Sequence, residues 1–144
     1  MYKTIFRILG LIFQGLIKTD NIADKYPISI KGLIRDSGRI ILLKNERNEW
    51  DFPGGKLENE EGVRYTLIKE IKEELNIEIK VGKPLYIENH LVNNVLVLII
   101  VFECFIISDE PILISHEHYE YKILGTNELD QLDKVQPWVS DCIN

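Results

Sequence analysis

The sequence has little cysteine. Among its 144 residues only Cys104 and Cys142 occur, the first inside an apolar run and the second near the end of the chain. Small secreted domains that depend on disulfides are much richer in cysteine. We therefore expect no disulfide framework, a reducing cytoplasmic location, and a buried, unreactive thiol at Cys104.

An excess of positive charge is also missing. Lys and Arg number 17 against 23 Asp and Glu, which gives a formal net charge of −6. General nucleic-acid binders and proteins that bind anionic membranes need basic patches, so both classes are disfavoured. A small-molecule substrate that carries phosphate remains compatible, because a bound metal ion can supply the positive charge.

No apolar run near the N-terminus is long enough to span a membrane. Residues 5–17 are apolar but contain Arg7 and Gln14, and the run is shorter than the roughly 20 residues of a transmembrane helix. It also lacks the small-residue cleavage site of a signal peptide. We expect residues 1–25 to form an N-terminal extension, a strand or helix that packs on the domain or on a partner subunit. A segment lying on a membrane surface is the alternative.

The composition is that of a single globular domain, which we assign to residues 26–144. With 45% hydrophobic and 28% charged residues, a chain of this length can bury a core without disulfides or metal staples. Apolar, β-branched stretches predict strands, and residues 95–107 are expected to form a central strand buried on both faces. The other expected strands are residues 28–35, 39–44, 78–81 and 85–91, with turns at 36–38 and 93–94 and short helices at 127–132 and 138–143.

The most informative stretch is residues 54–77, in which two glycines and an acidic loop precede a helix. Residues three and four apart share a helical face, so Glu70, Glu73 and Glu74 form one carboxylate cluster. A charged surface helix is the ordinary interpretation of such a run. Like charges at the rim of a core are better explained by a divalent cation, and carboxylate oxygens suit Mg²⁺ or Mn²⁺. The adjoining apolar stripe is predicted to consist of Leu67, Ile68, Ile71 and Leu75.

This stretch resembles the Nudix box. The box reads Gly, five residues, Glu, seven residues, Arg-Glu, an aliphatic, any residue, Glu-Glu, any residue, Gly and an aliphatic. It covers a small part of the chain, but chance matches to so long an ordered pattern should be rare. The residues that fall in register are Gly55, Glu61, Glu70, Ile71, Glu73, Glu74 and Ile77.

Two positions depart from the box. Lys69 stands where the family has arginine, and Asn76 stands where it has glycine. Asn76 is a mild change, because asparagine tolerates the left-handed conformation that ends a helix. In the family the arginine fork holds the catalytic glutamate, and a lysine at position 69 loses that bidentate geometry.

The residues just before the acidic loop also resemble the corresponding part of Nudix sequences. Trp50 and a Phe-Pro-Gly-Gly run are similar to the run-in of many Nudix boxes. Pro53 ends a strand, and Gly54 and Gly55 let the backbone turn tightly and approach a ligand. The resemblance implies that the Gly55 carbonyl is a metal ligand, whereas the diglycine taken alone is compatible with an ordinary turn.

Residues 115–124 resemble the loop and strand that follow the central strand in many Nudix hydrolases. In some members a glutamate of this loop completes the metal site or acts as the base. Glu117 matches that position best and Glu120 is second. His116 and His118 are interpreted as solvated loop residues, because their spacing lacks the helical HExxH arrangement and the cysteine partners of a zinc site.

The resemblance implies an α/β fold, the Nudix α/β/α sandwich with a mixed β-sheet between the box helix and the C-terminal helices. It implies a Nudix pyrophosphohydrolase that uses Mg²⁺ or Mn²⁺ to cleave the diphosphate linkage of a nucleoside diphosphate joined to another moiety. Glu70 is then a metal ligand that can also accept a proton, and Glu73 and Glu74 are the principal ligands. Glu61 organises the helix start or an outer-sphere water.

Two alternatives stay open at this stage. A Nudix-like binding or regulatory domain without catalysis would follow if Lys69 cannot hold Glu70. A hydrolase of a non-nucleotide diphosphate, such as an isoprenoid or sugar-linked one, differs in loop contacts that the sequence does not identify. We expect a small-molecule diphosphate as partner, no nucleic acid and no stable membrane span, and we leave a homodimer open.

Overall fold

The computed structural model describes residues 26–58, 60–118 and 120–143, so the extension predicted at residues 1–25 lies outside the described part. Strands and helices begin and end close to where the apolar patterns place them. The elements are β1 (Ile28–Asp36), β2 (Arg39–Lys44), β3 (Trp50–Asp51), β4 (Gly54–Lys56), α2 (Val63–Leu75), β5 (Ile79–Val92), β6 (Val95–Ile106), β7 (Glu120–Leu124), the 3₁₀ helix η2 (Thr126–Gln131) and α3 (Pro137–Ile143).

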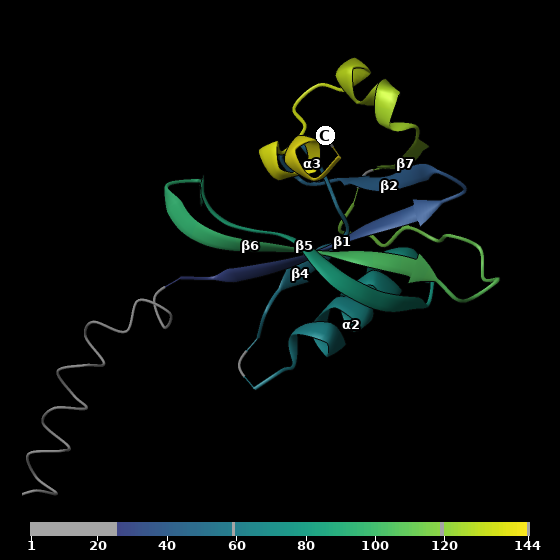
Figure 1. The fold of residues 1–144 in the computed structure, drawn as a ribbon, viewed down its shortest axis with the longest axis horizontal. Helices are drawn as coiled ribbons and strands as arrows, with labels where there is room; N and C mark the ends of the chain where they lie inside the picture. Colours follow the sequence, from purple (N-terminus) through teal and green to yellow (C-terminus); the bar gives the residue numbers. More distant parts are fainter. Residues whose placement is uncertain (1–25, 59, 119, 144) are drawn as a thin grey trace, which may run out of the picture.

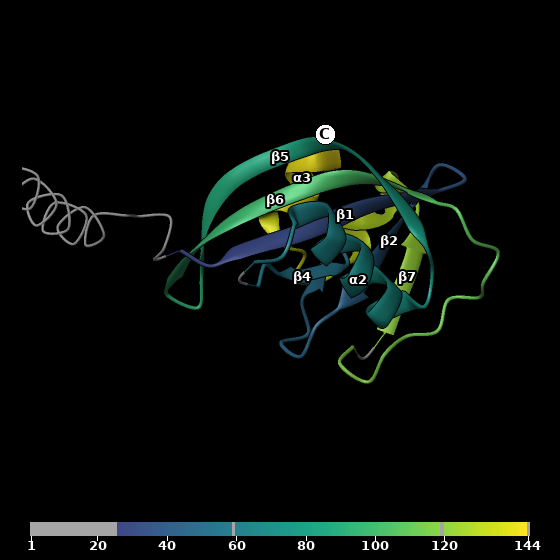
Figure 2. The same ribbon diagram turned by 90° about the horizontal axis from the view of Figure 1, so that it is seen from below.

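A mixed sheet forms the middle layer. Within the described residues it has seven strands, in the order β3-β2-β1-β6-β5, with β4 paired to β1 and β7 paired to β2. β1 and β6 run parallel, whereas β5 and β6 form an antiparallel hairpin. α2 covers one face of this sheet and α3 covers the other (Figures 1 and 2). The predicted α/β/α sandwich with a mixed sheet is therefore confirmed.

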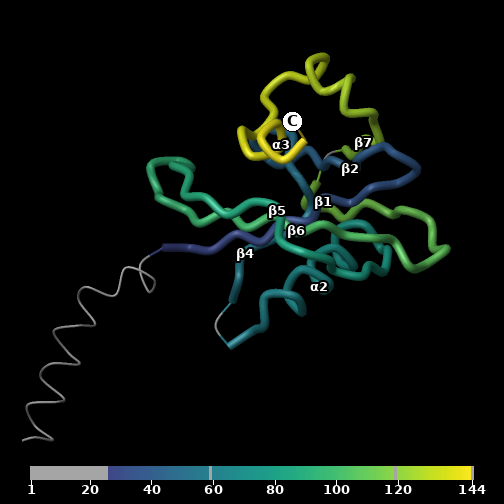
Figure 3. Tube along the Cα trace, in the orientation of Figure 1, coloured from purple at the N-terminus to yellow at the C-terminus, as the bar shows by residue number. Residues whose placement is uncertain are grey.

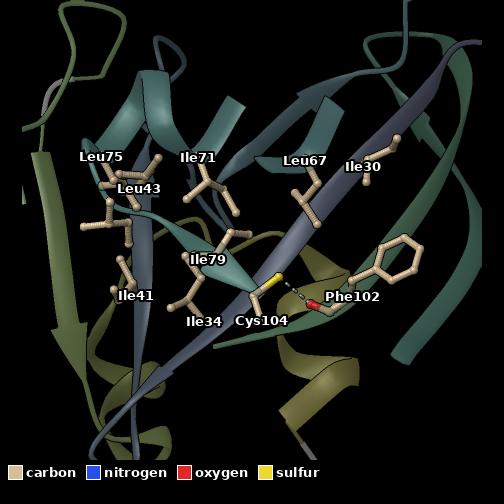
Figure 4. Packing of buried hydrophobic residues seen from close by; sticks show 11 residues of the cluster. Ile30, Ile34, Ile41, Leu43, Leu67, Ile71, Leu75, Ile79, Phe102 and Cys104 are labelled. Atoms are coloured by element: carbon tan, nitrogen blue, oxygen red, sulfur yellow. Dashed lines mark hydrogen bonds between the residues drawn. The ribbon is translucent and has the colours of Figure 1, made fainter. Parts of the chain in front are cut away.

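Alternating side chains of the central strands divide the core into two layers. Ile30 and Ile34 of β1 point toward α2, and Leu33 points toward α3. This alternation is what a strand covered on both faces requires. Figure 4 shows the α2 layer, where Leu67, Ile71 and Leu75 pack on the strands and the buried Cys104 thiol lies among them. Cys104 and Cys142 are both free, and burial raises the pKa of the Cys104 thiol to about 12, as expected of an unreactive core cysteine.

α2 forms because its apolar residues recur at helical spacing. Leu67, Ile71 and Leu75 are fully buried, and each such side chain contributes about 1.5–3 kcal/mol to stability. Asn76 ends the helix at φ 60°, and its backbone N–H donates to the Lys72 carbonyl. The prediction of a left-handed end is confirmed. The prediction that Ile68 belongs to the buried stripe is wrong, since this residue is 41% exposed.

The hairpin of β5 and β6 corrects two expectations. β5 is one long strand and not two, because the register shifts between Val81 and Tyr86 absorb the Gly82-Lys83-Pro84 interruption. Proline is tolerated here since β5 is at the edge of the sheet. The predicted turn at 93–94 is confirmed by positive φ at Asn93 and Asn94. β6 is central as predicted, but it is buried only in its middle, and its ends are exposed.

Candidate active site

The sheet forks next to the start of the box. β1 pairs through Ser29, Ile30 and Lys31 with β4 and, further along, through Arg35 and Asp36 with β2. At the branch point the Gly32 N–H donates to the Pro53 carbonyl at 2.8 Å. From β4 the chain descends to α2 beneath the sheet (Figure 3). The fork therefore places the diglycine against the carboxylate-bearing helix.

Both glycines of the diglycine are closely packed. Gly54 has φ +134°, and a Cβ there would lie 2.1 Å from the Ile30 carbonyl oxygen. A Cβ on Gly55 would lie 2.5 Å from Oε2 of Glu70. Real Cβ atoms do not approach other atoms so closely. A larger residue at position 54 would clash with the β1 backbone, whereas one at position 55 would displace the Glu70 side chain. The diglycine is therefore more than an ordinary turn, because it lets the β4 backbone contact the Glu70 carboxylate.

Glu74 is the most firmly held of the box glutamates. Its side chain is 8% exposed, and its two oxygens are bonded separately. Oε2 accepts the Gly54 backbone N–H at 2.8 Å, and Oε1 lies 2.8 Å from Nε2 of His118. A buried carboxylate requires such partners to remain ionised. Glu74 is thus fixed between the diglycine turn and the loop before β7.

Glu70 lies beside Glu74 with less compensation. Burial raises the pKa of the Glu70 carboxyl, and the neighbouring carboxylates of Glu74, Glu73 and Glu117 raise it further. Lys69 opposes this shift, with its Nζ 3.9 Å from Oε1 of Glu70. Glu73 is exposed at the surface of the helix. The cluster predicted from helical spacing is therefore real, and its negative charge is concentrated around Glu70.

Lys69, the departure from the box, binds a different glutamate. Its Nζ donates to Oε1 of Glu61 at 2.7 Å, and the Thr66 hydroxyl donates to Oε2 at 2.9 Å. These hydrogen bonds, from Lys69 first and Thr66 second, lower the pKa of Glu61. Lys69 therefore fixes the loop before α2 through Glu61 and is only a distant neighbour of Glu70.

The loop before β7 is tied to the end of α2. The Leu113 N–H donates to the Leu75 carbonyl at 3.0 Å, and the Ser115 N–H donates to the Glu74 carbonyl at 2.9 Å. These carbonyls have no partner within the helix, so the loop completes the helix end. The anchor brings Glu117 to the hollow lined by Glu70, Glu73 and Glu74, of about 230 Å³.

The structure separates the two loop glutamates that the sequence left as alternatives. Glu117 lines the same hollow as the box glutamates. Glu120 instead lies at the start of β7, 3.4 Å from the Lys44 ammonium, in a separate pocket next to Trp50. Glu120 is therefore not brought to the carboxylate cluster.

The interpretation of His118 as a solvated residue is wrong. Its side chain is 13% exposed and bonds Glu74, which raises the pKa of the imidazole. His116, two residues earlier, is exposed as predicted. No local pattern separates the two histidines, because the difference arises from the way the loop packs against α2.

A larger cavity, of about 560 Å³, lies between the cluster and the sheet. It is lined by Glu70, Glu74 and Glu117 and, from β1 and the segment before β4, by Lys31 and Asp51. Sequence reasoning missed both of the latter residues. The Lys31 ammonium lies 2.9 Å from Oδ2 of Asp51. An acidic residue directly before Phe-Pro-Gly-Gly is the signal that could have identified Asp51.

The cluster suits a hard divalent cation in the kind of donor it offers. Its donors are carboxylate oxygens, and burial, together with the neighbouring carboxylates, raises the pKa of Glu70. A cation would relieve the repulsion among these carboxylates. Across residues 26–58, 60–118 and 120–143, no three Asp, Glu, His or Cys side chains are already grouped tightly enough to hold an ion. Ion binding therefore requires small side-chain movements, for which the exposed Glu73 and Glu117 have room.

A family model described as the NUDIX domain matches residues 25–143 of this chain. The chain belongs to the NUDIX family. Its box, fork and buried glutamate are thus features of a NUDIX domain, and the resemblance to MutT-like members is confirmed. A solved MutT protein from Methanosarcina mazei Go1 superposes with a TM-score of 0.71 at 27% identity, covering 82% of this chain and 90% of that one. A NUDIX hydrolase from Nitrosomonas europaea, at 18% identity and a TM-score of 0.74, shares the fold and covers 83% of this chain and 86% of that one.

Two curated proteins resemble the NUDIX chain over shorter stretches. The CTP pyrophosphohydrolase of Escherichia coli (strain K12) is 35% identical over 66 residues, which are 42% of this chain and 47% of that protein. The 8-oxo-dGTP diphosphatase of Buchnera aphidicola subsp. Schizaphis graminum (strain Sg) is 32% identical over 60 residues, 38% of this chain and 46% of that protein. The match thus spans about half the length of each relative. Both names agree with the enzyme class expected from the box. Within the described residues, no helix is long and apolar enough to cross a membrane.

Proposed function

We propose that this NUDIX domain is a divalent-metal-dependent hydrolase that cleaves the diphosphate linkage of a nucleoside triphosphate. The observation that carries the proposal is the convergence of Glu70, Glu74 and Glu117 on one cavity, next to the diglycine turn. Acidic residues alone would repel a phosphate chain, so a cation between the carboxylates and the phosphates is needed to offset this repulsion. The cytoplasm, where nucleotides are made, is the expected site of action.

The residues that would hold Mg²⁺ or Mn²⁺ are the carboxylates of Glu70, Glu73, Glu74 and Glu117 and the carbonyl of Gly55. The ion would offset charge on the phosphate oxygens and lower the pKa of water. The position of Gly55 supports this set, because its backbone lies against the Glu70 carboxylate.

Three residues have distinct roles in this proposal: Glu70, Glu74 and Lys69. Glu70, whose raised pKa makes it the more basic carboxylate, accepts the proton of the attacking water. Glu74 is held in place by the Gly54 N–H and His118. Lys69 holds Glu61 and so fixes the loop that leads into α2.

The choice of a nucleoside triphosphate is supported by the printed activities of the two relatives. One is a CTP pyrophosphohydrolase and the other is an 8-oxo-dGTP diphosphatase. Both names denote nucleoside triphosphates, whereas nucleotide sugars and non-nucleotide diphosphates have no comparable support at this level of identity. Which base is preferred is the quantity that the assay below measures.

A substrate panel tests the proposal. Purified protein with Mg²⁺ or Mn²⁺ is assayed against CTP, dCTP, 8-oxo-dGTP, nucleotide sugars, ADP-ribose and dinucleoside polyphosphates, with phosphate release coupled to a pyrophosphatase or phosphatase. We expect one triphosphate to be turned over well above the rest and chelator to abolish its turnover. Folded protein that binds Mg²⁺ but cleaves nothing in the panel would favour the non-catalytic or non-nucleotide alternatives.

A further inference from the structure

A buried lysine faces the carboxylates across the larger cavity and has no part in the chemistry above. The Lys31 side chain is 14% exposed, and its ammonium lies 2.9 Å from Oδ2 of Asp51. Burial alone would lower the pKa of Lys31, but the Asp51 and Glu74 carboxylates raise it above its usual value. The residue is therefore a permanently charged group in a site where burying charge is unfavourable.

Asp51 is fixed by more than its ion pair. Its Oδ1 accepts the Trp138 indole N–H at 2.6 Å and the Phe52 backbone N–H at 2.7 Å. Trp138 comes from α3, so a helix on the far face of the sheet sets the orientation of this carboxylate. With Asp51 held from three directions, the lysine that pairs with it is held as well.

The ammonium of Lys31 has donors to spare. It carries three N–H groups, and Asp51 is the acceptor it meets among the described residues. Lys31 lines the same cavity as Glu70 and Glu74, with Arg47 as a further cation nearby. A ligand in this cavity would lie between carboxylates on one side and an ammonium on the other.

We propose that Lys31 binds a phosphate oxygen of the substrate, with Asp51 and Trp138 as the residues that position it. The assignment rests on the proposed function, because it takes the diphosphate to lie between the box glutamates and β1. A charge-assisted N–H···O hydrogen bond to phosphate is stronger than a neutral one and needs a positioned donor. Lys31 supplies such a donor from a rigid central strand.

The competing explanation is that Lys31 serves only as the counter-ion of Asp51. Under that explanation, removing both charges together restores the site, whereas removing Lys31 alone leaves Asp51 buried without its partner. The two explanations thus differ in the double variant. Asn at position 51 can still accept the Trp138 and Phe52 N–H groups through its oxygen.

The two explanations are distinguished by the binding of imidodiphosphate, an uncleaved diphosphate analogue, in the presence of Mg²⁺. Calorimetric titrations compare wild type with Lys31→Met, Lys31→Arg, Lys31→Met/Asp51→Asn and, as matched control, Lys80→Met on the exposed side of β5. We expect Lys31→Met and the double variant to bind about tenfold or more weakly, and Lys80→Met to bind like wild type. Lys31→Arg retains the charge and should bind within about threefold of wild type. If Lys31→Met does not fold, the double variant is compared with wild type instead, because it leaves no unpaired charge.

Three results would overturn the proposal. The first is a double variant that binds imidodiphosphate as tightly as wild type does. The second is a Lys31→Met protein that binds imidodiphosphate like wild type but binds nucleotide more weakly. The third is a wild-type protein that does not bind imidodiphosphate. Because the readout is binding, it is independent of turnover. A protein that hydrolyses nothing but loses imidodiphosphate affinity on Lys31→Met would refute the proposed function and retain the role of Lys31.

Discussion

The two sides of the cavity handle charge in opposite ways. On the acidic wall, formed by Glu70, Glu74 and Glu117, burial and then the neighbouring carboxylates raise the pKa of Glu70. On the paired wall, formed by Lys31, Asp51 and Arg47, each charge has a partner: Lys31 bonds Asp51, and Arg47 donates to Glu49 at 2.6 Å. The charges of the paired wall are therefore compensated within the protein, whereas Glu70 on the acidic wall lies among like charges.

The largest effect should come from the acidic wall. Glu70→Gln removes the carboxylate that we propose as a metal ligand and proton acceptor, so we expect kcat to fall by about 10²-fold or more. The metal-free variant should melt at a higher temperature than wild type near pH 7, because one member of a repelling cluster is gone. Steady-state kinetics and thermal melting, with and without Mg²⁺, check both outcomes. Full turnover in a folded Glu70→Gln protein would contradict the assigned role.

Glu117 and Glu120 offer a matched pair that sharpens the boundary of the acidic wall. Glu117 lines the hollow with the box glutamates, and Glu120 bonds Lys44 in another pocket. We expect Glu117→Gln to weaken Mn²⁺ binding by about tenfold, the effect of losing about 1.4 kcal/mol, and Glu120→Gln to leave it unchanged. Titration of Mn²⁺ by electron paramagnetic resonance measures both. The reverse order of effects would move the wall to Glu120.

The free energy of unfolding should depend on pH through Glu49, the partner of Arg47 on the paired wall. Burial alone would raise the pKa of Glu49, but hydrogen bonds from Arg47, Asn45 and Gln136 hold it below the usual value. A lowered folded pKa means that Glu49 stabilises the fold above its unfolded pKa of about 4.3 and loses this contribution as pH falls through the folded value. Wild type should therefore lose about 1 kcal/mol more than Glu49→Gln on acidification across that window. Denaturant unfolding at pH 6 and below pH 4 measures the difference, and parallel curves would refute it.

The smallest effect is expected at the departure from the box. Lys69 already bonds Glu61 and lies 3.9 Å from Glu70, so an arginine there adds little to the acidic wall. We expect Lys69→Arg to change kcat by less than about threefold, a difference of well under 1 kcal/mol. Kinetics of the purified variant check this. A large increase would show that the lysine limits catalysis, as the alternative of a binding or regulatory domain without catalysis requires.

Local spacing accounts for what could be predicted about the acidic wall. Glu70 and Glu74 share a helical face by geometry alone, and the same period identifies Leu67, Ile71 and Leu75 as buried. The prediction failed at Ile68, because the buried face of the helix is narrower than the apolar pattern of the sequence indicates. It also failed at β5, since bulges at an edge strand absorb a Gly-Lys-Pro interruption that resembles a break.

The paired wall could not be predicted in the same way. Lys31, Asp51 and Trp138 are far apart along the chain, and none belongs to a spaced motif. Their contacts depend on the register between β1 and β4 and on the packing of α3 against the sheet. His118 belongs with them, because only the docking of its loop on α2 distinguishes it from His116.

The sequence by itself determined the layers of the fold, the box helix and its cluster of carboxylates, since helix and strand periods are properties of neighbouring residues. The tertiary structure decided which glutamate of the loop joins that cluster, how closely the diglycine packs, and which cation lines the same cavity. Those facts depend on side chains from β1, β4, α3 and the loop before β7 meeting in space. Burial and hydrogen bonding set their charges and orientations, and neither is encoded at any fixed spacing along the chain.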